Sequence, residues 1–412
     1  MLIFTHPTGN ANVRHAALGL FRAGLLEEFW TCLNFHAPVL LERLLPGRLA
    51  SQLRRRAYPP ELAAAIHTRP FHEVMRLFAP RLGFPTLVAH EHGAFSVDAV
   101  YRALDRAVAR RLRRGGFSAV YAYEDGAQLS FLEARRRGLR TIYDLPIGYW
   151  RAARGLLLDE AVREPEWAAT LTGNHDSAAK HERKDAELAL ADVVFVASSY
   201  TRRTLAEAPG FKGTVAVVPY GAPTFTPAMP AAPAVPAKKL RVLFVGGLGQ
   251  RKGLSYLFAA CRQVQSAVTL TVIGQKPLEP CPVLDRELAA VRWIPGCPHQ
   301  QILAEMAAHD VFVFPSLFEG FGLVLLEALA MGLPVITTPH TAGPDLIHEG
   351  VEGFIVPIRD STAIAVHLER LHREPARLAD MSRQARLRAR EFSWTSYEET
   401  LAACVGQALA AP

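Results

Sequence analysis

The sequence predicts an α/β protein of two Rossmann-like domains, each with a parallel sheet covered by helices. Short apolar runs typical of buried strands alternate with helical patterns in both halves of the chain. The length of 412 residues suits two domains of ~100 to 200 residues each. Five prolines, interspersed with alanines, fall within residues 223–236 and indicate a semi-rigid linker. We therefore expect a first domain at residues 1–222, a linker at 223–237 and a second domain at 238–393.

The first domain begins with an apolar strand at residues 2–4, and a helix is expected at residues 13–26. The loop between them contains His6, Gly9 and Asn10. A loop that follows a parallel strand faces the carboxyl edge of the sheet, where open α/β sheets bind their ligands. Gly9 and Asn10 are therefore candidate ligand contacts, whereas His6 is interpreted as a loop histidine with no chemical role.

The next part of the chain is harder to assign. Residues 36–85 are rich in Leu, Arg and Pro and show no clear alternation of strands and helices. Within them, residues 40–53 are partly amphipathic, which fits insertion at a membrane surface or packing as a connecting helix. A strand is expected at residues 86–89, followed by His90 and His92. No further ligand follows at a suitable spacing, so a structural or acceptor-side role is favoured over a metal site.

Two later strand-loop units of the first domain carry acidic residues. A strand at residues 119–123 leads into Glu124 and Asp125, and a strand at residues 141–143 leads into Asp144. Both loops are expected at the carboxyl edge of the sheet. The three carboxylates are interpreted either as contacts for acceptor hydroxyls or as caps and turns. The other elements expected in this domain are helices at 97–114, 181–190 and 200–207 and strands at 193–197 and 215–218.

A glycine-rich loop with two adjacent cations opens the second domain. The strand that ends at Val245 leads into Gly246, Gly247 and then Arg251 and Lys252. A dinucleotide fingerprint would need a third glycine where Lys252 stands, so a nicotinamide cofactor is not expected. Glycines that admit close approach, next to cations that neutralise charge, suit a diphosphate. Further strands are expected at 269–273 and 291–294, and helices at 301–308, 360–373, 375–390 and 397–409.

Residues 311–357 form a predicted strand, glycine turn, helix and strand. The turn holds Glu319, Gly320 and Gly322, and Glu327 lies eight residues after Glu319, on the helix. The amides at a helix N-terminus suit a phosphate or a hydroxyl oxygen, and glycines allow close approach to the backbone. Carboxylates there are better acceptors for hydroxyl groups than partners for phosphate. A ligand with both vicinal hydroxyls and phosphates is indicated, which is a nucleotide sugar.

At these residues the chain resembles a known family. Glu319 and Glu327 around Gly-Phe-Gly, followed by Ala-Leu-Ala-Met-Gly-Leu-Pro-Val-Ile, resemble the signature of the retaining glycosyltransferases of the GT-B class called family four. The resemblance implies a GT-B fold with the two domains facing across a cleft. It also implies a terminal segment, residues 394–412, that crosses back onto the first domain. The implied reaction moves a sugar from a nucleoside diphosphate sugar to an acceptor hydroxyl, with retention at the anomeric carbon and no metal or other cofactor.

The resemblance also implies roles for single residues. Glu319 would orient the donor sugar, Glu327 would hold the ribose hydroxyls, and Arg251 and Lys252 would stabilise the leaving diphosphate. The remaining donor contacts that it implies are Gly9, Gly246, Gly247, Gly296, Cys297, Gly320, Phe321, Gly322 and Leu323, and the acceptor-side candidates are Asn10, Glu124, Asp125 and Asp144.

Two positions depart from the family's pattern. Residues 144–148 stand where the family often has a histidine against the donor sugar, so the identity of the sugar is left open. The family usually has an arginine at the position of Gly247, so Arg251 would take its place.

Charge and cysteine usage suggest where the protein works. Residues 43–140 contain 18 Lys or Arg against 8 Asp or Glu, a net charge of +10. This favours an anionic partner such as a membrane surface or a lipid-linked acceptor, although arginine-rich helix faces in solvent would explain it equally well. The five cysteines are scattered without metal spacing, which fits reduced thiols. No secretory signal or membrane span is evident, so a cytoplasmic location is expected, with peripheral association at the inner face of the membrane.

The same residues fit more than one function. The expected partners are a UDP- or GDP-linked sugar and an acceptor glycan, lipid or small molecule, in the synthesis of a polysaccharide, glycan or glycolipid, and no nucleic acid is expected. A nucleotide-sugar epimerase or a phosphorylase on the same scaffold are rivals among enzymes. A non-catalytic protein that binds a nucleotide or glycan is the rival of another class.

Overall fold

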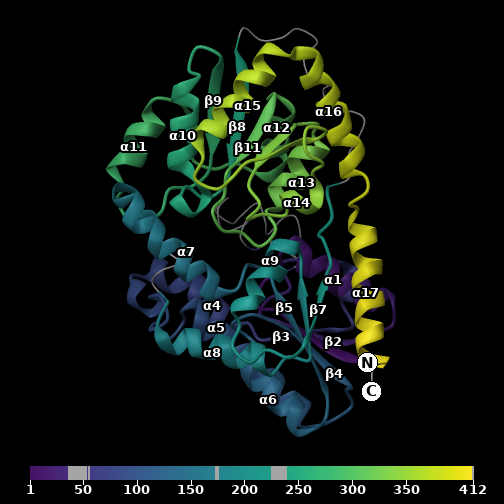
Figure 1. The fold of residues 1–412 in the computed structure, drawn as a ribbon. Helices are drawn as coiled ribbons and strands as arrows, with labels where there is room; N and C mark the ends of the chain where they lie inside the picture. The colour runs from purple at the N-terminus through teal and green to yellow at the C-terminus, as the bar shows by residue number, and fades with distance from the viewer. Residues whose placement is uncertain (36–52, 54–55, 172–175, 224–238, 411–412) are drawn as a thin grey trace, which may run out of the picture.

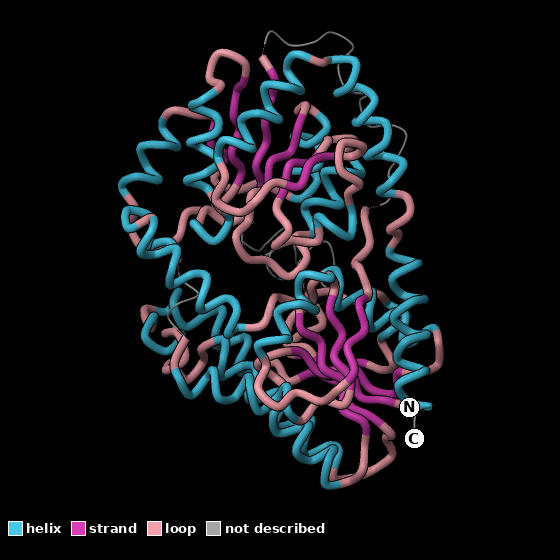
Figure 2. The backbone as a smooth tube through the Cα atoms, viewed as in Figure 1, coloured by secondary structure: helices cyan, strands magenta, loops and turns pink. Residues whose placement is uncertain are grey.

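The computed structural model describes residues 1–35, 53, 56–171, 176–223 and 239–410. Two α/β domains lie one above the other, each with a sheet flanked by helices (Figures 1 and 2). All strand pairs in both sheets are parallel in the described part of the chain. The fold class predicted from the sequence is therefore confirmed.

The sheet of the first domain has the strand order β3-β2-β1-β4-β5-β6-β7. Its strand β1 (Leu2–Thr5), which lies between β2 and β4, is fully buried because both neighbours and the flanking helices cover it. The loops after the parallel strands leave at one edge, which faces the second domain. The other strands are β2 (Leu26–Thr31), β3 (Ile66–Thr68), β4 (Ala119–Tyr123), β5 (Arg140–Leu145), β6 (Val193–Val196) and β7 (Thr214–Val217).

The sheet of the second domain has the order β10-β9-β8-β11-β12-β13. Every residue of β11 (Val311–Phe314) is buried, as expected for a strand that is covered on both faces of a parallel sheet. This strand lies between β8 and β12, so the loop after it leaves from the middle of the carboxyl edge. The other strands are β8 (Leu240–Val245), β9 (Val268–Ile273), β10 (Arg292–Ile294), β12 (Val335–Thr337) and β13 (Gly353–Ile355).

The helices flank the two sheets and continue beyond them at the C-terminus (Figure 1). In the first domain they are α1 (Ala11–Arg22), α4 (Phe71–Phe78), α5 (Val97–Leu112), α6 (Gln128–Arg136), α7 (Trp150–Arg163), α8 (Ala178–Ala189) and α9 (Ser199–Thr204). They continue as α10 (Leu254–Gln263), α11 (Pro282–Ala289), α12 (His299–Ala307), α13 (Leu323–Ala330), α14 (Gly343–Leu346), α15 (Ser361–Arg373), α16 (Pro375–Ala389) and α17 (Trp394–Ala410). Among the described residues, no helix combines the length and the apolar character that a membrane crossing requires.

The start of the first domain differs from its prediction. The first helix ends at Arg22 rather than at residue 26, and Gly24 follows with a left-handed φ of 68°. The chain then enters β2, which the sequence did not reveal because Glu27 and Glu28 interrupt its apolar run. Glu28 is buried there, and its carboxylate accepts hydrogen bonds from Arg111 (2.7 Å) and from the Trp30 indole (2.8 Å).

Residues 36–112 also contain elements that differ from expectation. The strand β3 and the helix α4 lie within the stretch that showed no alternation. The strand expected at 86–89 is wrong, because the chain forms a 3₁₀ turn at Pro85–Val88. The amphipathic segment at 40–53 lies outside the described residues, apart from Leu53.

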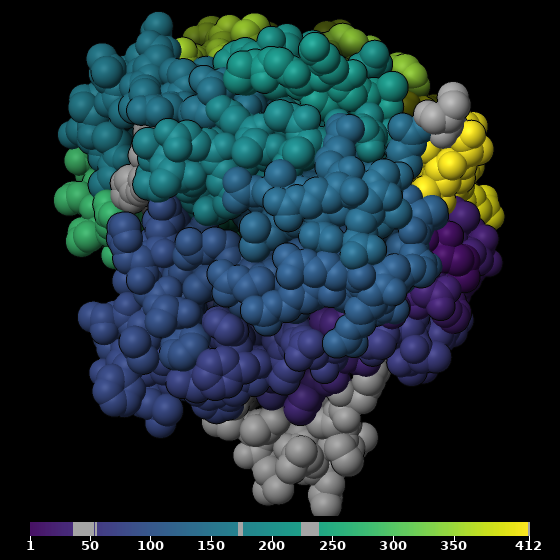
Figure 3. Space-filling view, turned by 90° about the horizontal axis from the view of Figure 1, so that it is seen from below, coloured from purple at the N-terminus to yellow at the C-terminus, as the bar shows by residue number. Residues whose placement is uncertain are grey.

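Two segments connect the domains: the linker between β7 and β8, and the C-terminal helix α17. The proline-rich linker at 224–237 lies outside the described residues, and the described strands end at β7 before it and resume at β8 after it. The helix α17 packs along α1, and Gly19 lies so close to the backbone of Glu398 that a Cβ would be 2.8 Å from it. Figure 3 shows this yellow C-terminal helix against the purple N-terminal segment. Residues 394–410 therefore lie against the first domain.

Candidate active site

The glycine loop after β8 is locked against the loop after β11. Gly253 has a left-handed φ of 71°, and a Cβ on it would collide with the Pro315 carbonyl oxygen. The amide of Leu317 donates a hydrogen bond to the Arg251 carbonyl oxygen (2.9 Å). Only glycine meets both requirements at residue 253, the left-handed backbone and the close approach. The short helical turn at Gln250–Lys252 is therefore fixed next to the glycine turn that follows Phe314.

Arg251, Lys252 and Glu319 converge at this junction. One Arg251 guanidinium nitrogen donates to the Phe318 carbonyl oxygen (2.6 Å) and lies 3.4 Å from Glu319 Oε2. The Lys252 ammonium forms an ion pair with the same carboxylate oxygen. The Lys252 and Glu319 side chains are each only 13% exposed. Two cations and one carboxylate thus share a nearly dry site, where electrostatic interactions are stronger than in water.

Burial affects the titration of the two cations. It lowers the pKa of Arg251. It also lowers the pKa of Lys252 well below its ordinary value, and the neighbouring Arg251 charge adds to that effect. The ion pair with Glu319 opposes the loss of the Lys252 proton. A second anion placed here would strengthen the charged form of both groups.

The turn that carries Glu319 folds back over the start of α13. Gly322 precedes α13 with a left-handed φ of 80°, and a Cβ on it would lie 3.6 Å from Glu319 Cγ. The amide of Gly320 donates to Glu319 Oε1 (3.3 Å). The first amides of α13 and the Glu319 carboxylate therefore lie at the same turn.

Glu327 lies on the second turn of α13 and pairs with a residue that the sequence analysis missed. Its carboxylate is 2.8 Å from Nε2 of His299, the first residue of α12. Glu327 is only 8% exposed, whereas the His299 side chain is 58% exposed. The hydrogen bond with Glu327 raises the pKa of His299. A protonated His299 would hold the Glu327 carboxylate fixed in position.

The first domain holds the glycine turn from the opposite side. The hydroxyls of Ser198 and Thr201, at the start of α9, both donate to the Gly320 carbonyl oxygen. A Cβ on Gly320 would collide with the Pro146 carbonyl oxygen, so the two backbones are in direct contact. The Ser199 amide also donates to Asp345 Oδ2 (2.8 Å). The backbone next to Glu319 is thus positioned by both domains.

A buried carboxylate on α7 joins the domains at the other side of the glycine loop. Glu160 is fully buried and accepts hydrogen bonds from Gln250 (2.7 Å), Tyr256 (2.9 Å) and Arg359 (2.6 Å) of the second domain. The Gln250 amide in turn donates to the Thr170 hydroxyl (2.8 Å). Because Gln250 directly precedes Arg251, this network fixes the loop that carries the two cations. The sequence analysis did not predict α7 or its contacts.

The other donor-side candidates are spread along the carboxyl edge of the second sheet. Gly246 and Gly247 follow β8, and a Cβ on Gly247 would meet no atom within 4 Å. Gly296 and Cys297 follow β10. Phe321 is buried against Tyr220 (ring centroids 5.1 Å apart), so its backbone rather than its ring is available to a ligand. Leu323 is the first residue of α13 and is partly buried.

The candidates in the first domain fall into different environments. Gly9 is buried and Asn10 is exposed in the loop before α1, and both line a small cavity of about 390 Å³. Glu124 forms an ion pair with Lys184 (3.4 Å), and Asp125 forms one with Arg183 (3.0 Å). These two carboxylates are therefore engaged by α8. The pairing supports the structural interpretation of Glu124 and Asp125 over contacts with an acceptor.

Asp144 and His6 are both buried below this edge. Burial raises the pKa of Asp144 to about 7, and hydrogen bonds from tyrosines, including Tyr121 (2.7 Å), partly oppose the shift. His6 packs edge-on against Tyr123 (ring centroids 4.7 Å apart), and burial lowers its pKa to about 4. His6 is therefore neutral at physiological pH, which fits its interpretation as a loop histidine.

The histidine segment at residues 90–92 lies next to α8. His90, Glu91 and Asp176 each offer one ligand atom, and these atoms lie within 4.8 Å of one another. The carboxylates already have partners, since Glu91 accepts from the Ser177 amide (2.8 Å) and Asp176 pairs with Lys180 (3.0 Å). His92 is exposed and is not part of the group. The arrangement accounts for this cluster as a structural contact between the segment and α8.

The second domain is similar in sequence to known glycosyltransferases. Residues 239–374 match the family described as Glycosyl transferases group 1. The amylovoran biosynthesis glycosyltransferase AmsK of Erwinia amylovora is 34% identical over 145 residues, which are 32% of this chain and 36% of that protein. The D-inositol 3-phosphate glycosyltransferase of an Arthrobacter species is 32% identical over 186 residues, which are 42% of this chain and 44% of that protein. The chain thus spans less than half the length of these relatives.

Solved structures match over the whole chain. Sucrose-phosphate synthase of Thermosynechococcus elongatus superposes with a TM-score of 0.65 at 18% identity and covers 98% of this chain and 97% of its own. HepE of Anabaena, solved in complex with UDP and glucose, superposes with a TM-score of 0.61 at 16% identity and covers 98% of this chain and 99% of its own. Both domains and their relative arrangement are therefore those of the GT-B fold.

Proposed function

We propose that this chain, whose second domain is a glycosyl transferases group 1 domain, transfers a sugar from a nucleoside diphosphate sugar to an acceptor hydroxyl. The observation that carries the proposal is the convergence of Arg251, Lys252 and Glu319 where two loops of the second domain meet. The names of the relatives support a role in polysaccharide or other glycan synthesis. A UDP complex of HepE, which shares the fold, supports a nucleotide-linked donor.

During sugar transfer, negative charge develops on the leaving diphosphate and must be stabilised. The Arg251 backbone is fixed by a hydrogen bond from Leu317, and its guanidinium donates to the Phe318 carbonyl oxygen, so little reorganisation is required when that charge develops. In the structure, the partner of Arg251 and Lys252 is Glu319. A diphosphate would compete with this carboxylate for Lys252, which would release Glu319 to accept hydrogen bonds from the hydroxyls of the donor sugar.

Glu327 would bind the ribose hydroxyls of the donor. Its burial and its bond to His299 orient the carboxylate before a ligand arrives. Two hydroxyls donating to one fixed carboxylate would contribute charge-assisted hydrogen bonds that a neutral side chain cannot replace. We also propose that the anomeric configuration is retained and that the protein cations serve where a metal would otherwise stand.

A two-part experiment tests the proposal. Thermal unfolding is measured with UDP-, GDP- and ADP-linked sugars, because a bound donor stabilises the folded state in proportion to RT ln(1 + [L]/Kd). Release of nucleoside diphosphate is then measured for each donor that binds, without an acceptor. We expect stabilisation and slow hydrolysis with the same donor. Stabilisation without any release would support a non-catalytic binding protein, and interconversion of the sugar would support an epimerase.

A further inference from the structure

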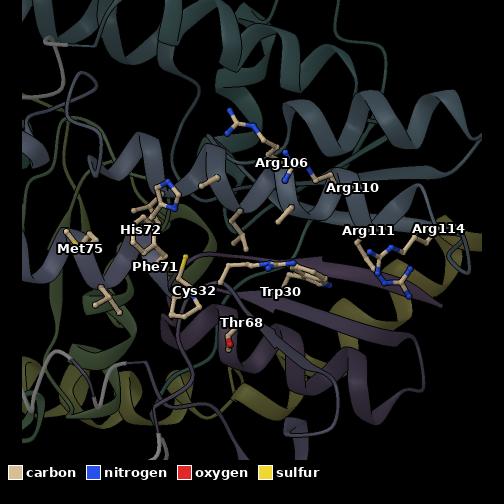
Figure 4. Close-up of a pocket in the computed structure, with 17 residues that line it drawn as sticks. Trp30, Cys32, Thr68, Phe71, His72, Met75, Arg106, Arg110, Arg111 and Arg114 are labelled. Atoms are coloured by element: carbon tan, nitrogen blue, oxygen red, sulfur yellow. The ribbon is translucent and has the colours of Figure 1, made fainter.

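A large cavity lies in the first domain, apart from the loops that carry Arg251 and Glu319. Its volume is about 860 Å³, and it is bounded by α4, α5 and the β2-β3 edge of the sheet (Figure 4). The size suits a single small or medium ligand, since protein sites for such ligands measure ~300 to 1,000 Å³. None of the proposed donor contacts lines it.

One end of the cavity is apolar. Phe71 and Met75 of α4 lie at that end in Figure 4 with His72 beside them, and Cys32, Val100 and Leu104 add further apolar wall. Burial raises the pKa of the Cys32 thiol to about 12, and the nearby Glu73 charge adds to that shift. Phe71 is 62% exposed, so apolar surface continues from the cavity to the solvent. An aliphatic chain would be removed from water here.

The other end is cationic. Arg110, Arg111 and Arg114 lie at that end in Figure 4, Arg106 lies one turn before Arg110 on α5, and Arg69 also lines the cavity. Arg111 is paired with Glu28 (2.7 Å). In the described part of the chain, no carboxylate lies within ion-pair distance of Arg106, Arg110 or Arg114, and Arg69 lies over the Trp30 ring (5.3 Å to the centroid).

We propose that this cavity binds one lipid molecule with a phosphate head group. The lipid chain would occupy the apolar end, and the phosphate would lie among Arg106, Arg110 and Arg114. Guanidinium groups bind phosphate oxygens through paired hydrogen bonds, and several can surround one phosphate. Neither end alone identifies the ligand, whereas an apolar wall that leads to unpaired arginines matches an anionic amphiphile.

The position of the arginines separates this site from the transfer reaction. Val97 and Val100 of α5 line the small cavity that includes Gly9 and Asn10, and Val100 borders the large cavity as well. Arg106 and Arg110 lie six and ten residues beyond Val100, which places them ~9 to 15 Å further along the helix at 1.5 Å per residue. The head group would therefore anchor the protein to a lipid rather than present the acceptor hydroxyl. This inference does not depend on the proposed reaction.

Titration calorimetry of the full chain tests the site with lysophosphatidate below its micelle concentration. Lysophosphatidylcholine and inorganic phosphate are the reference ligands. We expect one lysophosphatidate per chain and much weaker binding of both references. The double variant Arg106→Glu/Arg110→Glu should weaken binding by at least about tenfold. The matched control Arg102→Glu/Arg136→Glu changes the net charge equally at exposed residues that do not line the cavity, and it should change the affinity by less than about twofold.

Chain length tests the apolar end. From hexyl to decyl phosphate, each added methylene should tighten binding about threefold to fourfold. Ala107→Trp, which fills the cavity, should abolish that trend. Its thermal unfolding shows whether it folds, and Ala103→Phe replaces it if it does not. Affinity that is independent of chain length, or that falls equally in both charge variants, would overturn the proposal.

Sedimentation with phosphatidylglycerol vesicles distinguishes a lipid in the cavity from general attraction to a charged bilayer. We expect Ala107→Trp and Arg106→Glu/Arg110→Glu both to reduce the bound fraction, while the control pair leaves it nearly unchanged. If Ala107→Trp leaves the bound fraction unchanged and both charge variants reduce it equally, the protein is attracted to the charged surface and the proposed site is rejected. Hydrolysis of the donor should be unchanged in all of these variants, so its loss would concern the transfer reaction and not the lipid site.

Discussion

The two domains share one architecture but use their cations differently. In the second domain, Arg251 and Lys252 are mostly buried, fixed by backbone contacts and paired with Glu319. In the first, Arg106 and Arg110 of α5 are exposed and lack such partners among the described residues. Buried, preorganised charge suits a reaction that creates charge, whereas hydrated and mobile charge suits association with a surface or an anionic ligand. The same residue types thus indicate different functions according to their burial.

The largest expected effect tests the buried side of this comparison. Lys252→Ala should lower kcat for sugar transfer by ~100-fold to 1,000-fold, as expected when one preorganised group that stabilises developing charge is removed. Steady-state kinetics with the donor identified by thermal shift would measure it. Arg110→Ala is the matched control from the exposed set. If the two variants lose similar activity, the distinction between the domains fails.

Glu327→Ala should have the next largest effect, on donor binding. The loss of one or two charged hydrogen bonds of ~1.5 to 3 kcal/mol each should raise the donor KM by at least ~10-fold, with a smaller change in kcat. His299→Ala should act in the same direction but less, because it removes only the partner that orients Glu327. A donor KM unchanged in Glu327→Ala would remove this residue from the proposed site.

Asp144 tests how a buried carboxyl group in the first domain affects the free energy of unfolding. Its pKa is about 7 in the fold against an ordinary value of 3.8, so the folded state holds a proton that the unfolded state has lost. The free energy of unfolding should therefore fall as the pH rises from about 4 to about 7, and level off above that range. Asp144→Asn should remove this contribution and stabilise the protein at pH 8 by about 1 to 2 kcal/mol.

Urea unfolding of wild type and Asp144→Asn across this pH range would show the difference as two curves that separate with rising pH. Parallel curves would mean that Asp144 does not titrate there. The hydrogen bond from Tyr121 should survive, since an amide oxygen accepts as a carboxylate oxygen does.

The smallest effect concerns the exposed arginines. Arg106→Gln and Arg114→Gln should each change the free energy of unfolding by less than about 0.5 kcal/mol, because they are surface substitutions with no paired carboxylate to leave behind. Thermal unfolding in low and high salt would check this. A loss of unfolding free energy as large as that of a core substitution would show that these side chains stabilise the fold. The arginines of the two domains would then not differ in the way described above.

Much of the second domain could be predicted from the sequence because its signals are local. The buried strand Val311–Phe314, the left-handed glycine turn and α13 follow each other within 20 residues, and each has its own pattern. The adjacency of Arg251 and Lys252 to Glu319 was also expected, because the loops of neighbouring parallel strands meet at one edge. Glycines, prolines and apolar runs were sufficient for these elements.

The missed features depend on contacts between distant residues. The strand β2 was concealed by Glu28, which is tolerated in the interior only because Arg111, 83 residues later, pairs with it. Glu124 looked available for a substrate until Lys184 of α8 was placed beside it. Glu160 connects α7 to Gln250 across 90 residues, and His299 meets Glu327 across 28. No periodicity reports such pairings, because they follow from topology.

The packing of α17 against α1 affects how the first domain folds during translation. The face of α1 that contacts Glu398 stays uncovered until α17 leaves the ribosome, roughly 20 to 75 s later at ~5 to 20 residues per second. The amino-terminal half therefore cannot complete its interior as it emerges. A nascent chain stalled just before Trp394 should expose apolar surface to chaperones that the finished molecule conceals.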